Sequence, residues 1–151
     1  MAGPVSPLDA HLGYWLRFVS NHVSHAFRRK VEAEGVTVAE WVVLRELFDH
    51  DAAAPSELAA RLGMTRGAIS KLADRLEAKG LAARTADPHD RRWQSLALSE
   101  RGRALVPVLA ALADRNDAEF FAALAPDDRA TIERAMREIV RRLGLRAVPL
   151  E

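Results

Sequence analysis

The sequence predicts a mainly α-helical fold that contains one β-hairpin, and three observations support this prediction. Apolar residues recur at three- and four-residue steps in long segments at both ends of the chain. Two short helical patterns in the middle are joined by a tight turn. After Gly80 the apolar residues alternate instead, and turn-forming residues divide the alternating stretch in two.

The first predicted helix begins near Ser6 and ends near Gly35. Ser6 can cap this helix, and Pro7 suits its first position. A continuous apolar stripe follows: Leu8, Leu12, Trp15, Leu16, Val19, Val23, Phe27 and Val31. Because a helix of about 25 residues exceeds the usual length of about 11 to 12, we expect its stripe to pack on a helix of a second subunit.

A second helix is predicted from about Val38 to Phe48, because Thr37 and Glu40 form a capping box at its start. Its expected core residues are Trp41, Val42, Leu44, Leu47 and Phe48. Residues 49–54 break the helical period and are expected to form a loop before Pro55.

A helix-turn-helix is predicted from Pro55 onward. A short helix should end at Gly63, and Thr65 should cap a second helix that runs to Lys79. A β-hairpin should follow, with strands at 81–85 and 93–98 around a turn at 87–92. Beyond it, Ser99 should cap a long helix that reaches about 124, and a last helix should run from 126 to about 144.

Composition excludes several classes of protein. Hydrophobic residues make up 49% and charged residues 28% of the chain, which is ordinary for a globular domain. The chain has no cysteine, which removes disulfides, thiolate catalysis and cysteine zinc sites. It has no secretory signal pattern and no run of about 18 apolar residues. We therefore expect a cytoplasmic, bacterial protein without a membrane partner.

The distribution of charge is more informative than the net charge of +1. Between Pro55 and Leu98, eight Lys and Arg residues stand against five Asp and Glu residues, so this segment carries +3. The basic excess therefore lies in the helix-turn-helix and the hairpin, where a nucleic-acid-binding surface would be expected.

The helix after Thr65 has the features that reading duplex DNA requires. Its first residues are small or basic, which permits close approach to the major groove and favours phosphate at the amino end. Cations follow on the outward side. The predicted DNA-binding residues of this helix are Thr65, Arg66, Ala68, Ser70, Lys71 and Arg75.

Three residues of the hairpin turn complete the predicted DNA-binding set. Arg91 and Arg92 can follow the DNA backbone and enter the minor groove, whose potential attracts arginine. Asp90, which precedes them, either orients one guanidinium group or only serves the turn, where aspartate is favoured.

These segments together resemble the MarR family of bacterial winged helix-turn-helix regulators along nearly the whole chain. The matching residues are 55–59, 62–63, 67–72, 76, 79–81, the hairpin turn 87–92, 96–99 and 102. The resemblance implies a homodimer built by the terminal helices, a recognition helix in the major groove and Arg92 in the minor groove. It also implies a ligand pocket between the dimerisation helices and the DNA-binding lobe. Peroxide-sensing members of the family use cysteine, which this chain lacks.

The expected organisation therefore has three parts. Residues 1–36 form an N-terminal dimerisation helix, residues 37–98 a winged helix-turn-helix DNA-binding domain, and residues 99–151 the C-terminal dimerisation helices. The fold class is mainly α, with a β-hairpin as the wing.

A small aromatic or phenolic effector is the expected ligand of the implied pocket. Its candidate contacts are Tyr14, Trp15, His22 and Trp41, although core packing explains the three aromatic residues equally well. His22 and His25 lie three residues apart, a spacing at which two imidazoles can share a metal, but the sequence offers no third ligand. We therefore predict no metal and no cofactor.

The predicted function is sequence-specific binding of a pseudo-palindromic DNA operator by a homodimer, most simply as a repressor that a small molecule releases. The alternative is a winged-helix protein-interaction module that binds no operator. Salt dependence separates the two, because phosphate neutralisation makes affinity fall steeply with salt. We predict no enzymatic activity, because the sequence has no phosphate-binding loop, nucleophile motif or metal cluster.

Overall fold

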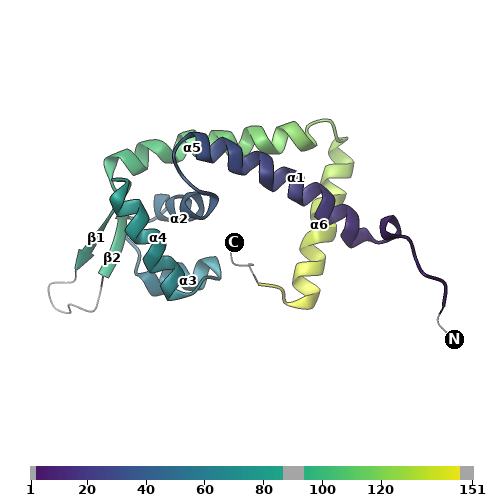
Figure 1. Ribbon diagram of the computed structural model, residues 1–151, viewed down its shortest axis with the longest axis horizontal. Coiled ribbons are helices and arrows are strands. Elements are labelled where there is room, and N and C mark those ends of the chain that lie inside the picture. The colour runs from purple at the N-terminus through teal and green to yellow at the C-terminus, as the bar shows by residue number, and fades with distance from the viewer. Residues whose placement is uncertain (1–2, 87–93, 147–151) are drawn as a thin grey trace.

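The chain forms a helical lobe with a hairpin at one end and long helices that extend away from it (Figure 1). The computed structural model describes residues 3–86 and 94–146. After a 3-10 turn η1 (Leu8–Ala10), the elements in order are α1 (Leu12–Ala33), α2 (Val38–Phe48), α3 (Pro55–Leu62), α4 (Arg66–Ala78), β1 (Ala82–Ala86), β2 (Gln94–Leu98), α5 (Glu100–Phe121) and α6 (Pro126–Leu143).

The first long helix begins later than the sequence predicts. Leu8–Ala10 is a separate 3-10 turn, Ser6 caps neither this turn nor α1, and α1 starts at Leu12. The indole nitrogen of Trp15 donates to the carbonyl oxygen of Asp9 at 2.9 Å. In a continuous helix that carbonyl would accept from the amide four residues on. The prediction of an unbroken helix from Ser6 is therefore wrong.

The predicted starts of α2 and α5 are confirmed by their capping hydrogen bonds, and α3 and α6 begin at Pro55 and Pro126 as predicted. The hydroxyl of Thr37 accepts from the amide of Glu40 at 3.1 Å, and the carboxylate of Glu40 accepts from the amide of Thr37 at 3.3 Å. Ser99 caps α5 by accepting from the amide of the third residue of that helix at 3.0 Å. Gly63 ends α3 with a φ of 65°, a left-handed conformation that glycine adopts without strain.

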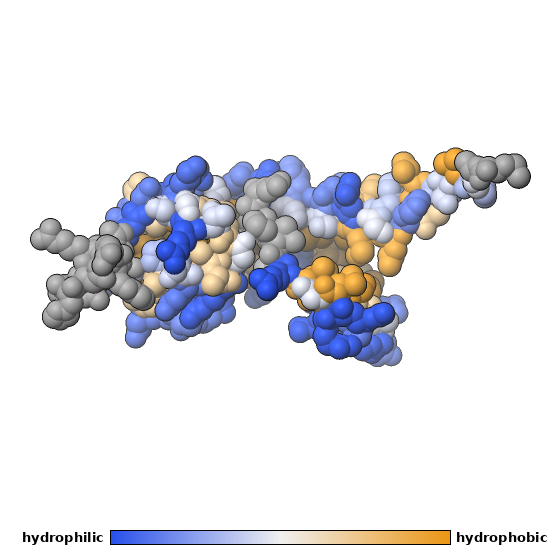
Figure 2. Space-filling view, turned by 90° about the horizontal axis from the view of Figure 1, so that it is seen from below, coloured by the Kyte–Doolittle hydropathy of each residue, from blue (hydrophilic) through white to orange (hydrophobic). Residues whose placement is uncertain are grey.

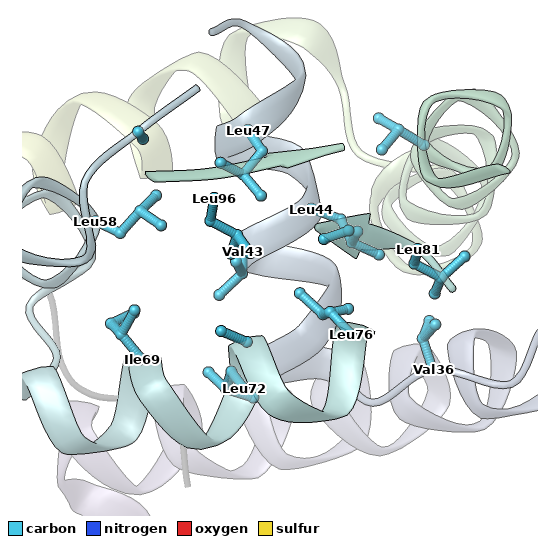
Figure 3. Close-up of a cluster of buried hydrophobic side chains, with 14 of the residues drawn as sticks. Val36, Val43, Leu44, Leu47, Leu58, Ile69, Leu72, Leu76, Leu81 and Leu96 are labelled. Carbon is cyan, nitrogen blue, oxygen red and sulfur yellow. The ribbon is translucent and has the colours of Figure 1, made fainter. Parts of the chain in front are cut away.

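The core of the lobe lies where α2, α3, α4 and the hairpin meet (Figure 3). Of the predicted core residues of α2, Leu44 and Leu47 are fully buried, whereas Trp41, Val42 and Phe48 are only half-buried. Val43 is completely buried although its burial was not predicted. The reason is that α2 contacts α1, α3, α4, α5 and β2, so more than one of its sides faces the core.

The hairpin pairs β1 and β2 antiparallel, from Ala82 opposite Leu98 to Ala86 opposite Gln94. The predicted hairpin is therefore confirmed in its strands, while its turn lies outside the described residues. Ala53, in the predicted loop before α3, forms an additional bridge to Leu96 through two backbone hydrogen bonds of 3.0 and 2.8 Å. This bridge ties the start of the helix-turn-helix to the hairpin.

The lobe meets α5 at a tightly packed joint. Gly102, in the first turn of α5, lies against the backbone of Leu81, and a Cβ placed on it would come within 2.0 Å of the Leu81 carbonyl oxygen. The hydroxyl of Ser99 also donates to the carbonyl oxygen of Gly80 at 2.7 Å. The direction in which α5 leaves the lobe is therefore fixed by direct backbone contact.

Polar groups connect α1 to α5 beyond the lobe. The buried side chain of Asn116 donates to the carbonyl oxygen of Val23 at 3.1 Å. The ammonium group of Lys30 donates to the Asn116 side-chain oxygen at 2.9 Å and to Glu119 at 2.8 Å. Because buried polar groups must be hydrogen-bonded, these bonds fix one alignment of the two helices.

The outer ends of the long helices expose apolar side chains. No residue of α6 is buried, and its exposed apolar residues are Ile132, Met136, Ile139, Val140 and Leu143. The first half of α1 similarly exposes Leu12, Trp15, Leu16, Phe18 and Val19. Figure 2 shows hydrophobic patches on the part of the molecule beside the lobe. None of the described helices is both long and apolar enough to span a bilayer.

One ion pair joins α6 to α5. The Arg129 guanidinium donates to a carboxylate oxygen of Asp117 at 2.7 Å. This hydrogen bond and the attraction of the Asp117 charge raise the pKa of Arg129. The pair is exposed, so it contributes little to stability, and α6 depends on other contacts for its position.

Candidate nucleic-acid interface

Helix α4 separates a buried side from a solvent-facing side. Ile69, Leu72, Ala73 and Leu76 are buried against the lobe. The predicted DNA-binding residues Thr65, Arg66, Ser70, Lys71 and Arg75 are all exposed, and Ala68 is half-buried. The structure thus brings the predicted residues of this helix together at its start and along one outward surface.

The hydroxyl of Thr65 has a local structural role at the amino end of α4. It accepts a hydrogen bond from the amide of Ala68 at 3.1 Å. A Cβ placed on Gly67 would have its nearest neighbour at 4.0 Å, so no side chain of the lobe fills the space beside this residue. The beginning of α4 is therefore an open surface that another molecule can approach closely.

Arg84 of β1 fastens the hairpin to α4. One of its guanidinium nitrogens lies 2.6 Å from a carboxylate oxygen of Asp74 and 3.2 Å from one of Glu77. The other nitrogen donates to the carbonyl oxygen of Ser70 at 3.0 Å and lies 3.4 Å from its hydroxyl. The hydroxyl of Ser70 therefore already has a partner within the protein.

This arrangement determines the charge of the outward side of α4. Arg84 offsets the carboxylates of Asp74 and Glu77, while Arg66, Lys71 and Arg75 form no ion pair with any described residue. Three exposed cations thus project from one helix. Phosphate groups are the ligands that such a surface favours, especially beside a helix amino end.

An ion pair and a hydrogen bond also anchor the carboxyl end of α4. The ammonium group of Lys79, the last residue before the turn, lies 2.7 Å from a carboxylate oxygen of Glu40 and donates to the Gly35 carbonyl oxygen at 2.9 Å. Glu40 is only 1% exposed. A buried charge that loses its partner is costly, so this pair holds the end of α4 against the start of α2.

Sequence reasoning missed both anchors of α4. Arg84 and Lys79 were counted only as contributors to a basic segment, and Glu40 only as a cap. For Arg84 the signal in the sequence was opposite charge on either side of the turn at Gly80, but charge alone does not identify which partners meet. These residues position the interface and do not themselves face outward with the three cations.

The three predicted residues of the hairpin turn cannot be placed on this surface. The strands of the hairpin end at Ala86 and resume at Gln94. Asp90, Arg91 and Arg92 therefore lie outside the described residues.

Three of the predicted effector contacts form an exposed row on α1. The rings of Tyr14 and Trp15 lie edge to face with their centroids 5.3 Å apart. His22 lies 5.2 Å from the ring of Phe18, which itself neighbours both other rings. Within the part of the chain that the structure describes, no three His, Cys, Asp or Glu side chains gather as metal ligands.

The fourth predicted effector contact lies elsewhere. Trp41 of α2 packs against Phe27 with the ring centroids 6.5 Å apart. Phe27 is five residues from His22, the nearest member of the row along α1, which corresponds to about 7.5 Å of helix. Trp41 therefore lies beyond one end of the aromatic row, next to Phe27.

A helix-turn-helix followed by an antiparallel hairpin, with long helices on either side, defines a winged helix-turn-helix protein. The model of the MarR family matches residues 34–92, from the end of α1 through the hairpin turn. Over these residues the chain matches the MarR family, as the sequence motifs suggested, whose members are DNA-binding transcription regulators rather than enzymes.

Individual relatives agree with this assignment. The chain is 42% identical over 72 residues to the HTH-type transcriptional repressor MdtR of Bacillus subtilis, a match that covers 48% of this chain and 46% of MdtR. The chain thus matches less than half the length of that repressor.

Two solved structures extend the likeness over nearly the whole chain. CouR from Rhodococcus jostii RHA1, solved with p-coumaroyl-CoA, is 28% identical with a TM-score of 0.76, over 97% of this chain and 100% of CouR. A mutant of MarR from E. coli, solved with operator DNA, is 25% identical with a TM-score of 0.76, over 85% of this chain and 93% of that one. The predicted fold class is therefore confirmed.

Proposed function

We propose that the chain is a repressor that binds a pseudo-palindromic operator as a homodimer in the cytoplasm. The observation that carries this proposal is the outward side of α4, where Arg66, Lys71 and Arg75 stand without carboxylate partners among the described residues. The α4 helices of the two subunits would enter successive major grooves about 34 Å apart. MdtR, to which the chain is 42% identical over 72 residues, is named a transcriptional repressor.

The exposed apolar sides of α1 and α6 support the homodimer. Ile132 and Ile139 of α6 are 45% and 43% exposed, and Met136, which lies between them on the same side of the helix, is 44% exposed. Apolar patches of this kind mark surfaces that another protein covers. A second copy of the chain offers the same two patches, which a two-fold axis would pair.

The hairpin is proposed to add minor-groove contacts. Arg92 is the residue that matches the wing arginine of the family, with Arg91 and Asp90 beside it. A narrow minor groove attracts arginine electrostatically, so these contacts would favour A·T-rich flanks of the operator.

A small aromatic or phenolic effector is proposed to release the operator. The solved complex of CouR with p-coumaroyl-CoA, a phenolic acyl group on coenzyme A, supports a ligand with a phenolic ring in a protein of the same fold. The proposed contacts are Tyr14, Trp15 and His22 of the aromatic row and Trp41.

The proposed function is tested by selecting bound fragments from genomic DNA and titrating one of them by fluorescence anisotropy at several salt concentrations. We expect the logarithm of affinity to fall linearly with the logarithm of salt, because each neutralised phosphate releases counterions. A flat salt profile, with no preference among fragments, would instead favour the protein-interaction module.

Arg92→Ala tests the wing within the same assay. A lost base or minor-groove contact of about 1 to 3 kcal/mol should weaken binding roughly 5- to 150-fold while the oligomeric state stays unchanged. Arg134→Ala, an exposed residue of α6, is the matched control and should bind as the parent does. Unchanged affinity for Arg92→Ala would refute the role of this arginine.

A further inference from the structure

A groove lies between the end of α1, the end of α4 and the start of α5. It has a volume of about 530 Å³ and opens to solvent on the lobe. That size falls within the range of about 300 to 1,000 Å³ in which small-molecule sites are found. Neither the outward side of α4 nor the aromatic row on α1 contributes to it.

The walls of this groove are aliphatic. Val36 and Leu81 lie next to each other at the margin of the lobe core and form its floor (Figure 3). Leu105 is half-buried, and Val108 is 45% exposed although it is apolar. No aromatic side chain is among the described residues that line the groove. An alkyl chain therefore fits this surface better than a ring that needs an aromatic partner.

Arg101 supplies a cation held in position on the rim. One of its terminal nitrogens donates to the carbonyl oxygen of Lys79 at 3.1 Å, which fixes the guanidinium beside the end of α4. A guanidinium has five N–H donors, and Arg101 forms no ion pair with any described residue. A guanidinium that is already positioned binds a carboxylate at a lower entropic cost.

The other charged residues on the rim have different roles. Lys79 is neutralised by Glu40, 2.7 Å away, so it has less charge to offer a ligand. Glu34 is the one carboxylate among the lining residues described, and it opposes an anion. Arg101 is therefore the group to which an anionic ligand would bind.

We propose that this groove binds a medium-chain aliphatic carboxylate, with its carboxylate on Arg101 and its chain against Val36, Leu105 and Val108. This site is separate from the aromatic row that the effector is proposed to use. The inference does not depend on operator binding, because ligand binding can be measured on the protein alone.

Isothermal titration of the full chain with octanoate and with uncharged octanamide tests the proposal. We expect saturable binding of octanoate and at least tenfold weaker binding of octanamide, because only octanoate can pair with the guanidinium. Equal binding of the two compounds, or no saturable binding of octanoate, would overturn the proposal.

Matched variants locate the site. Arg101→Gln should weaken octanoate at least tenfold, whereas Arg103→Gln should leave it unchanged because Arg103 lies over the ring of Phe48, 5.5 Å from its centroid. Glu34→Gln should strengthen octanoate several-fold by removing the opposing charge. Octanoate could also adhere to the apolar sides of α1 and α6, so binding that Arg101→Gln leaves intact would count against the groove.

Discussion

The lobe and helix α6 differ in where their apolar residues are covered. In the lobe, Leu44, Leu58 and Ile69 are buried by other elements of the same chain. In α6, Ile132 and Ile139 have helical spacing just as regular, yet both remain more than 40% exposed. The lobe therefore completes its own core, whereas α6 requires a surface that one chain does not supply.

Energetic considerations support this distinction. Full burial of one aliphatic side chain stabilises a protein by about 1.5 to 3 kcal/mol. The apolar residues of α6 therefore represent several kcal/mol that the isolated chain does not gain. An exposed ion pair such as the one between Arg129 and Asp117 stabilises too little to replace this contribution. The comparison predicts that changes in α6 act on assembly, while changes in the lobe act on folding.

The largest effect is expected for Ile139→Asp in α6. A charge in the middle of the apolar side should prevent dimerisation, and the loss of two-site binding should weaken operator affinity by about a thousandfold. Light scattering would report the mass, and circular dichroism should stay close to that of the parent because no residue of α6 is buried by the described part of the chain.

The control for this variant is Ala130→Asp, which adds the same charge to the opposite side of α6, beside Arg134 and Arg137. It should remain dimeric. If Ile139→Asp were also dimeric, the distinction between the two regions would fail, because α6 would then have no part in assembly.

A smaller effect is expected for Leu44→Ala in the lobe. Removing a fully buried leucine should lower the free energy of unfolding by about 3 kcal/mol, through lost apolar burial and a cavity. Urea titration of the lobe transition would measure this change. The exposed Leu12→Ala of α1 serves as the comparison and should change that transition little. A similar loss in both variants would show that lobe and terminal helices fold as one unit.

The smallest effect is expected for Thr65→Ala at the start of α4. The lost hydrogen bond to the Ala68 amide should cost about 1 kcal/mol of stability. Thr65→Ser keeps the hydroxyl and should retain most of that stability in the same denaturation experiment. If both variants were equally destabilised, the methyl group rather than the cap would be responsible.

Features that depend on neighbouring residues could be predicted from the sequence. The capping box at Thr37 and Glu40, the turn at Gly63 and the caps at Thr65 and Ser99 all operate within one helical turn. The outward location of the predicted residues of α4 also followed, because apolar spacing alone indicates which side of a helix is buried.

Features that depend on distant residues could not be predicted in this way. Arg84 meets Asp74 across a turn, and Lys79 meets Glu40 from another helix 39 residues earlier. Periodicity does not reveal such pairs. The start of α1 was mispredicted for a related reason, since the side chain of Trp15 takes a backbone acceptor that helix propensity assigns to an amide.

The contact between Gly102 and Leu81 has a mechanical consequence. The backbones of Gly102 and Leu81 touch with no space for even a methyl group. The lobe and the start of α5 are therefore expected to move as one rigid body. A tilt of the first turns of α5 would therefore also tilt α4. In the proposed dimer, the distance between the two α4 helices would then depend on the contacts that α1 and α6 make between the subunits.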